Sequence, residues 1–254
     1  MLTLNNERTV DRALASVTFA DELVVVDSGS TDGTLDIARR YTDRIVHHDW
    51  PGFRDQYQYA QDQCSHDWVL FVDADEEISP LLATEIKETL TADDGHADGY
   101  NVHRRTFFVD RWILHGAWVR DSEIRLYRKA RGCWKGDLHA CVHVDGKVID
   151  MRHFCYHYTY EDIADQIATL NRYSNIGAED LKRQGKNCTL IKLIGNPVMG
   201  FLRDYVLRLG FLDGRSGLII AVNTAVSTFN KYAKLWERRL SAEQVETGGK
   251  RKPE

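Results

Sequence analysis

The first half of the chain alternates short apolar runs with stretches in which apolar residues recur at helical spacing. Runs rich in β-branched residues predict strands, and apolar residues three or four positions apart predict helices. Strands separated by helices of this length predict parallel βαβ units, and therefore an α/β sheet. The expected strands are residues 2–4, 23–26, 44–46 and 68–72, and the expected helices are residues 7–17, 34–40, 53–64 and 81–90.

The second half changes in character, because residues 100–127 are rich in aromatic and basic side chains. An Asp-Gly pair between strand-like runs predicts a hairpin, and a long apolar periodicity that stops at a glycine predicts a helix. The expected elements are strands at 99–103 and 123–127, a hairpin over 139–149 around Asp145-Gly146, and a helix over 160–184.

Composition describes a folded protein, with 254 residues, 43% hydrophobic and 28% charged. The five cysteines are odd in number and lack CxxC spacing. We therefore expect neither a disulfide framework nor a zinc site, and a reducing cytoplasm. Polar residues from Asn5 to Arg8 interrupt the start, so no signal peptide is expected. No apolar run reaches the ~18 residues that would predict a spanning helix.

Charge is distributed unevenly. Residues 1–181 carry 19 Lys or Arg against 32 Asp or Glu, whereas residues 182–254 carry 14 against 6. An acidic body with a basic tail predicts that the tail meets something anionic. The alternative is a solvated basic helix.

Two carboxylates follow the strand expected at residues 68–72. Asp73 and Asp75 are spaced i and i+2, at a strand end. Mg²⁺ and Mn²⁺ favour oxygen ligands and are commonly held by one or two carboxylates plus substrate phosphates. The pattern therefore predicts a site for a metal-bound diphosphate. The alternative is a solvated acidic turn before the next helix.

A second polar loop, Asp27 to Thr34, follows the strand expected at 23–26. Its glycines let the backbone approach a ligand, and its small polar residues can cap the next helix. By itself this is also what a well-capped strand-to-helix turn looks like. Ligands of parallel sheets bind beyond the carboxyl ends of the strands, so Asp27 and the Asp73/Asp75 pair are expected to share a site.

The motifs Asn-Asn-Glu at residues 5–7, VVVDSGSTDGT at 24–34 and FVDADEE at 71–77 occur in order. Together they resemble family 2 glycosyltransferases of the GT-A fold, over residues 1 to about 90. The resemblance implies a Rossmann-like nucleotide-sugar-binding sheet, a nucleotide-sugar donor and Mg²⁺ or Mn²⁺. Family members normally have more residues in the first strand than precede Asn5 here.

The resemblance also implies roles for individual residues. Asp27 and Ser28 would contact the donor, Asp73 the ribose or the metal, and Asp75 the metal. An inverting transfer needs a base for the acceptor hydroxyl, and the family pattern selects Asp121, with Glu123 as runner-up. The alternative is that Asp121 caps a turn or pairs with a neighbouring arginine. Arg125 is expected to face the donor diphosphate, since Arg suits bidentate phosphate contact.

Histidines add a further candidate set. Many relatives have His-Glu where this chain has His139-Ala140. A local group of four, His139, His143, His153 and His157, lacks the ligand spacing of known zinc sites, so hydrogen-bonding histidines are favoured. His139 and His157 remain candidates for contact with the acceptor or the metal.

The tail mixes aromatic, aliphatic and basic residues over 196–211 and 217–236, without a stretch suited to span a bilayer. The pattern predicts a helix in the headgroup plane with four cations near anionic lipid: Lys231, Lys234, Arg238 and Arg239. The alternative is packing against the catalytic domain. Residues 209–218 resemble the tail of family 2 glucosyltransferases of the bacterial lipopolysaccharide core.

The resulting expectation is an inverting transferase that moves a hexose, glucose by resemblance, from a UDP-sugar to the lipopolysaccharide inner core. It would act at the inner face of the bacterial inner membrane, without nucleic acid. Rival interpretations are a capsule, polyprenyl-linked or protein acceptor, or an inert nucleotide-sugar-binding scaffold. The expected domains are 1–185 (halves 1–95 and 96–185), a helical amphipathic region at 186–240 and a flexible tail at 241–254.

Overall fold

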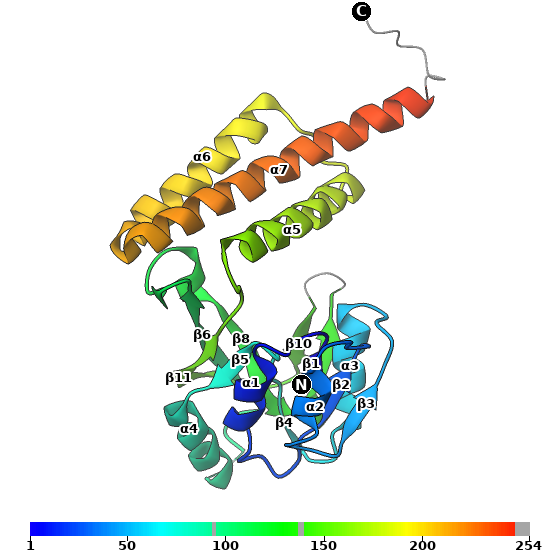
Figure 1. Cartoon of the computed structure of the whole chain (residues 1–254), viewed down its shortest axis with the longest axis vertical. Helices are drawn as coiled ribbons and strands as arrows, with labels where there is room; N and C mark the ends of the chain where they lie inside the picture. The colour runs from blue at the N-terminus through cyan, green and yellow to red at the C-terminus, as the bar shows by residue number, and fades with distance from the viewer. Residues whose placement is uncertain (93–94, 137–139, 247–254) are drawn as a thin grey trace, which may run out of the picture. The chain divides into compact units, whose positions relative to one another are not determined.

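The computed structural model describes residues 1–92, 95–136 and 140–246 (Figure 1). The chain forms two compact units. The sheet unit comprises residues 1–107 and 119–159, and the helical unit comprises residues 108–118 and 160–254. The helix at 163–183 thus belongs to the helical unit, so the compact units do not coincide with the division expected at residue 185.

The first half of the sheet unit contains a parallel sheet of order β1-β2-β3. The strands and helices expected there are confirmed as elements, with bounds that differ by up to three residues at either end. They are β1 (Leu2–Thr3), α1 (Val10–Ser16), β2 (Val25–Asp27), α2 (Thr34–Ala38), β3 (Ile45–His47), α3 (Phe53–Gln63), β4 (Trp68–Leu70) and α4 (Pro80–Thr91).

The fourth expected strand departs from the parallel pattern. β4 pairs antiparallel with β8 (Ser122–Arg128) at the end of a mixed sheet of order β4-β8-β6-β11-β5. Among the described residues it pairs with no strand of the parallel sheet. The strands that complete the order of the mixed sheet are β5 (Glu76–Ile78), β6 (Gly99–Phe108) and β11 (Val148–His157).

The prediction of a hairpin over residues 139–149 was wrong. β10 (Cys141–Val144) pairs with β9 (Gly132–Lys135), while β11 pairs with β6 and β5. Burial explains the divergence, because Val142 of β10 packs on Trp134, whereas Met151 and Cys155 of β11 enter a different core cluster.

Helix α4 closes one face of the mixed sheet. Ser79 caps its first turn by accepting a hydrogen bond from the Leu82 amide. Leu82 and Ile86 then pack in one cluster with Val102 of β6 and Met151 of β11. The helix is therefore anchored by the periodic apolar face that its sequence predicts.

The helical unit is built on long helices, which Figure 1 draws side by side. Asp162 caps α5 (Ile163–Arg183) by accepting from the Asp165 amide. The remaining elements of the helical unit are β7 (Arg111–Trp112), η3 (Ile191–Gly195), α6 (Asn196–Phe201), η4 (Leu202–Leu207), η5 (Gly210–Asp213) and α7 (Gly214–Glu246). Two 3₁₀ turns, η1 (Ala117–Arg120) and η2 (Lys129–Arg131), lie earlier in the chain. Across the described ranges, no helix combines the length and apolar character needed to cross a bilayer.

The cations of α7 that were expected near lipid face α5 instead. Lys234 Nζ donates to Asn171 Oδ1 at 2.6 Å and to Ser174 Oγ at 2.7 Å. Arg238 Nη1 lies 3.0 Å from a carboxylate oxygen of Glu179. These two charges therefore stabilise the packing of α7 on α5.

Candidate functional site

The Asn-Asn-Glu motif is hydrogen-bonded to the loop that follows β2. The Thr31 amide donates to Asn5 Oδ1 at 2.8 Å, and the Gly33 amide donates to Glu7 Oε2 at 3.1 Å. In return, the Asn6 amide donates to Thr34 Oγ1 at 2.8 Å. The two motifs, which are about 25 residues apart in the sequence, thus form one hydrogen-bonded unit. We call this unit, residues 5–7 and 27–34, the rim. The hydrogen bonds explain why both motifs are present in the sequence.

Asp27 organises this rim from inside. It is 2% exposed, and its carboxylate accepts from the Gly29 and Ser30 amides at 2.9 and 3.0 Å. Ser28 Oγ accepts from Gln56 Nε2 at 2.9 Å, and Gln56 is itself fully buried. The structure therefore shows Asp27 and Ser28 bonded within the protein, and their contact with a donor stays a prediction.

The strands that lead into the two polar loops both pack against β1. Leu2 of β1 packs against the cluster of Val24 and Val26, and also against the cluster of Val69 and Phe71. Because Asp27 and Asp73 follow these clusters along the chain, both loops lie at the carboxyl edge of their strands, where α/β sheets bind ligands.

The acidic loop after β4 is a tight turn held by a buried ion pair. The Glu76 amide donates to the Asp73 carbonyl, and the Asp73 amide donates to Glu76 Oε2. Arg125 Nη2 lies 2.8 Å from Asp73 Oδ2 and 2.5 Å from Glu76 Oε1. Burial disfavours the Arg125 cation, but these carboxylates and Glu123 hold the pKa of Arg125 well above its ordinary value.

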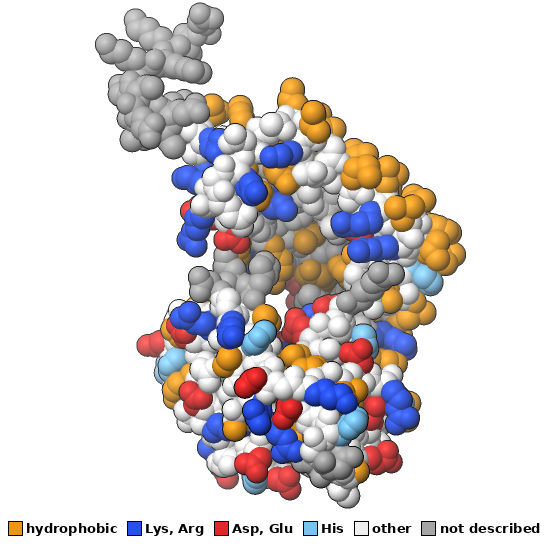
Figure 2. Space-filling model, turned by 180° about the vertical axis from the view of Figure 1, so that it is seen from behind, with side chains coloured by type: hydrophobic (Ala, Val, Ile, Leu, Met, Phe, Trp, Pro, Cys, Tyr) orange, Lys and Arg blue, Asp and Glu red, His pale blue; other side chains and the backbone are white. Residues whose placement is uncertain are grey.

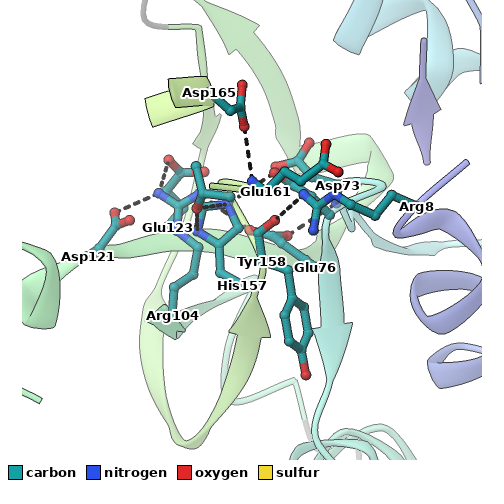
Figure 3. A network of polar contacts seen from close by, with 12 residues as sticks. Arg8, Asp73, Glu76, Arg104, Asp121, Glu123, His157, Tyr158, Glu161 and Asp165 are labelled. Carbon is teal, nitrogen blue, oxygen red and sulfur yellow. Dashed lines mark hydrogen bonds and ion pairs between the residues drawn. The ribbon is translucent and has the colours of Figure 1, made fainter. Parts of the chain in front are cut away.

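A second guanidinium joins this loop to the predicted base (Figure 3). Arg104 of β6 bonds Asp121 Oδ1 at 2.6 Å, Glu123 Oε1 at 3.0 Å and Glu76 Oε1 at 3.3 Å. Asp121 is 37% exposed, whereas Arg104 is 13% exposed. The carboxylate of Asp121 is thus fixed in position while part of it remains open to solvent.

His157 completes the network from the end of β11. Its Nε2 lies 3.4 Å from Asp75 Oδ2, because β11 pairs with β5 directly beside the acidic loop. Burial disfavours both charges, but their mutual attraction raises the pKa of His157 and lowers the pKa of the Asp75 carboxyl. Asp75 is 29% exposed, so the pair is reachable from outside.

The network joins five of the residues selected from the sequence, and the outcome differs among them. Asp73, Asp75, Asp121 and His157 lie in it as partly exposed side chains. Arg125 is only 2% exposed and is enclosed by carboxylates, so its contact with a diphosphate stays a prediction. His139 lies outside the described residues.

Sequence reasoning missed Glu76 and Arg104, which hold the network together. A signal for Arg104 exists, because it shares the strand phase of Val102, Thr106 and Phe108, all of them buried. A charged residue on the inward phase of a strand indicates a partnered charge.

The donor set at Asp75 suits a divalent cation. Two ligands at about 2.1 Å from a metal and at right angles to each other lie about 3 Å apart, close to the 3.4 Å between the Asp75 and His157 atoms. Five carboxylates lie in the network with the guanidiniums of Arg104 and Arg125: Asp73, Asp75, Glu76, Asp121 and Glu123. Among the residues that the structure describes, no three or more His, Cys, Asp or Glu side chains are grouped so that they could hold a metal ion by themselves.

An α/β sheet with two polar loops at its carboxyl edge and a carboxylate-rich network is the arrangement expected of a glycosyltransferase of the GT-A fold. Residues 1–154 match the family described as "Glycosyl transferase family 2", and the chain belongs to this family.

Relatives extend over nearly the whole chain. The "Lipopolysaccharide core biosynthesis glycosyltransferase LpsC" of Rhizobium meliloti is 32% identical, over 94% of this chain and 91% of that protein. An uncharacterised glycosyltransferase of Rickettsia typhi is 30% identical, over 96% of this chain and 88% of that protein.

Two solved structures are also similar. The crystal structure of S. aureus TarS 1–349 has 17% identity and a TM-score of 0.46, over 95% of this chain and 90% of that chain. Glucosyl-3-phosphoglycerate synthase from Mycobacterium tuberculosis in complex with Mn²⁺ and UDP-glucose has 18% identity and a TM-score of 0.45, over 73% and 77%.

Proposed function

We propose that the protein is an inverting hexosyltransferase that uses a UDP-hexose, with glucose as the expected sugar, and a lipid-linked saccharide of the lipopolysaccharide inner core. The observation that supports this most is the single network that connects Asp75 and His157 to Asp121 through Arg104 and Glu76. The Asp75–His157 pair on the donor side and the exposed carboxylate of Asp121 are thereby held in fixed positions relative to each other, as a displacement reaction requires.

On the donor side, the rim formed by residues 5–7 and 27–34 would receive the nucleoside, and Asp75 with His157 would hold Mg²⁺ or Mn²⁺. When bound, such a cation neutralises charge on the leaving diphosphate. Arg125 and Glu76 position Asp73 beside this pair through the 2.8 Å contact to Arg125. The rigid turn limits the reorganisation needed as charge develops.

On the acceptor side, Asp121 is the base. The acceptor hydroxyl oxygen attacks the anomeric carbon, the bond from that carbon to the diphosphate oxygen breaks, and UDP leaves with the electron pair. The hydroxyl proton passes to the Asp121 carboxylate. Arg104 bonds Asp121 Oδ1 at 2.6 Å, which leaves Oδ2 for the proton. Attack from the face opposite the leaving group inverts the anomeric centre.

The acceptor class rests on the relative LpsC, whose name assigns it to lipopolysaccharide core biosynthesis and which aligns along almost the full length of this chain. A saccharide carried on lipid A requires the enzyme to work at a membrane surface. We accordingly place the protein as a peripheral enzyme on the inner face of the bacterial inner membrane, with the helical unit as its contact.

The donor assignment is tested by UDP release from UDP-glucose with added Mn²⁺ or Mg²⁺. Asp75→Asn should lower kcat about 10²-fold or more, since an interaction of several kcal/mol with the leaving group is lost. Asp36→Asn, at a carboxylate that is 85% exposed on α2, is the matched control. Full metal-dependent turnover by Asp75→Asn would refute the metal role, and no UDP release by the unaltered protein with any UDP-sugar would favour the inert scaffold.

The base is tested separately with Asp121→Asn, which keeps an oxygen for Arg104. Transfer to a lipopolysaccharide core acceptor should fall by about 10² to 10⁴ in kcat, with KM for the donor and the metal dependence unchanged. The same loss in Glu123→Gln, without one in Asp121→Asn, would move the base to Glu123. Transfer to a capsule, polyprenyl-linked or protein acceptor in place of core saccharide would replace the acceptor and keep the chemistry.

A further inference from the structure

The helix formed by η3, α6 and η4, here called the α6 segment (Ile191–Leu207), has its hydrophobic side facing outward. Six aliphatic side chains along it are between 46% and 83% exposed: Ile191, Ile194, Val198, Met199, Val206 and Leu207. We call this set the outer face. Its spacing repeats every three, four or eight residues, so the side chains share one side of the helix.

The inward side of the same helix is only partly apolar. Pro197 and Asp204 are the residues that it buries, and Leu193, Gly195, Gly200, Phe201 and Tyr205 are partly buried. A helix that packs in water normally places its large aliphatic side chains inward. The α6 segment packs on α7 with Leu193, Phe201 and Tyr205 partly buried, yet it leaves most of its aliphatic side chains in water. The outer face is therefore suited to contact with an apolar environment outside the protein.

Charge around the outer face has one sign. Between residues 186 and 230 the chain has five Lys or Arg and only two acids, Asp204 and Asp213. Both acids are at most 5% exposed, and they bond within the unit, Asp204 to Arg203 and Asp213 to the His115 amide. The exposed charges within this stretch of sequence are therefore cations. Figure 2 shows the hydrophobic side chains along the edge of the helical unit, with Lys and Arg beside them.

We infer that the outer face of the α6 segment is the surface that inserts into an anionic lipid bilayer. This inference rests on the peripheral location proposed above and specifies which part of the tail makes the contact. Aliphatic side chains enter the boundary between headgroups and acyl chains, and the flanking cations meet lipid phosphates. The cations of α7 are not the contact, since Lys234 and Arg238 bond α5.

A bilayer fits this surface better than a second copy of the chain does. Two copies that met through the outer face would bring Arg203 and Arg215 of each close to the like charges of the other, and Asp110, the exposed acid beside Ser216, is already paired with Arg111. Anionic headgroups supply the opposite charge along the whole face.

The test is sedimentation of the full chain with vesicles of phosphatidylcholine, with and without phosphatidylglycerol. The triple variant Ile191→Gln, Met199→Gln, Leu207→Gln removes the most exposed aliphatic groups, which are 83%, 62% and 74% exposed and so tolerate polar replacement. It should lower partitioning to anionic vesicles at least tenfold. The control triple Leu81→Gln, Ile167→Gln, Val226→Gln, at sites 51–63% exposed, should partition as the unaltered protein does.

Charge is tested with Arg215→Gln and Lys192→Gln, which should weaken binding a few-fold to anionic vesicles and not at all to neutral ones. Equal loss in the control triple, or none in the outer-face triple, would overturn the assignment and leave the peripheral location intact. No binding by the unaltered protein would refute both. A dimer in lipid-free solution that the outer-face triple dissociates would show that a second copy covers this face. UDP release stays unchanged in every variant, so these results are independent of the transferase proposal.

Discussion

Helix α4 of the sheet unit and the α6 segment of the helical unit have similar aliphatic content but bury opposite sides. In α4, Leu82 and Ile86 are 0% and 1% exposed, whereas in the α6 segment Ile191 and Leu207 are 83% and 74% exposed. Each helix also buries one carboxylate, which accepts hydrogen bonds within its own unit. The spacing of aliphatic residues thus identifies an apolar side on both helices. It does not predict whether that side is covered by the protein itself or faces its surroundings.

The two units also differ in how closely their elements pack. Large side chains of α4 fill the space above a pleated sheet, where packing density rewards volume. In the helical unit the chain approaches itself so closely that Gly217 of α7 lies against the Gly210 carbonyl, and a Cβ there would overlap it. Gly210 and Gly217, which have no Cβ, allow this approach between η5 and the start of α7.

Matched leucine truncations break the comparison most directly. Leu82→Ala should lower the free energy of unfolding by about 2–5 kcal/mol, because it opens a cavity in the core. Leu207→Ala should change it by less than about 0.5 kcal/mol, since the side chain is mostly in water already. Urea unfolding without lipid measures both. A cost at Leu207 equal to that at Leu82 would mean that the outer face is covered within the protein.

Two glycines sharpen the comparison within the helical unit. Gly217→Ala should destabilise it by about 1–3 kcal/mol, because an added Cβ must displace the Gly210 backbone. Gly200→Ala has no atom within 4 Å of the new Cβ and should stabilise the α6 segment by about 0.5–1 kcal/mol through helix propensity. Thermal unfolding followed by circular dichroism ranks the two. Indifference at Gly217 would contradict the close approach.

The sequence predicted the sheet unit well where local pattern decides the structure. The β-branched run before Asp27 and the apolar run before Asp73 are followed by polar loops because strand, turn and cap signals agree there. The family motifs then selected Asp75, Asp121 and His157, and the structure places all three in one network.

Long-range pairing is what the sequence could not supply. β11 lies between β6 and β5, so His157 reaches Asp75 across more than 80 residues of chain. Glu76 and Arg104 come within bonding distance only because of that strand order. Neither the Asp145-Gly146 turn nor the acidic loop after β4 predicts that order from the sequence. The prediction for the tail cations lacked the same information, since the partners of Lys234 and Arg238 on α5 are about 60 residues earlier in the chain.

The buried acid of α4 gives the smallest effect and depends on pH. Glu85 accepts from the Arg152 and His153 amides at 3.0 Å. Burial opposes its charge, but these bonds and the His153 ring hold the pKa of Glu85 below its ordinary value of 4.5. Glu85→Gln should therefore cost about 1 kcal/mol at neutral pH.

A lowered pKa in the folded state means that the ionised form stabilises the fold. The contribution of Glu85 is fully present above pH 4.5 and declines as the pH falls through its lower folded value. The gap in unfolding free energy between Glu85→Gln and the unaltered protein should close over that acidic range, whereas Glu88→Gln, at an exposed site on the same helix, should show no such convergence. A gap that persists at the acid end would show that Glu85 acts through packing, and that α4 gains nothing from the charge of its buried carboxylate.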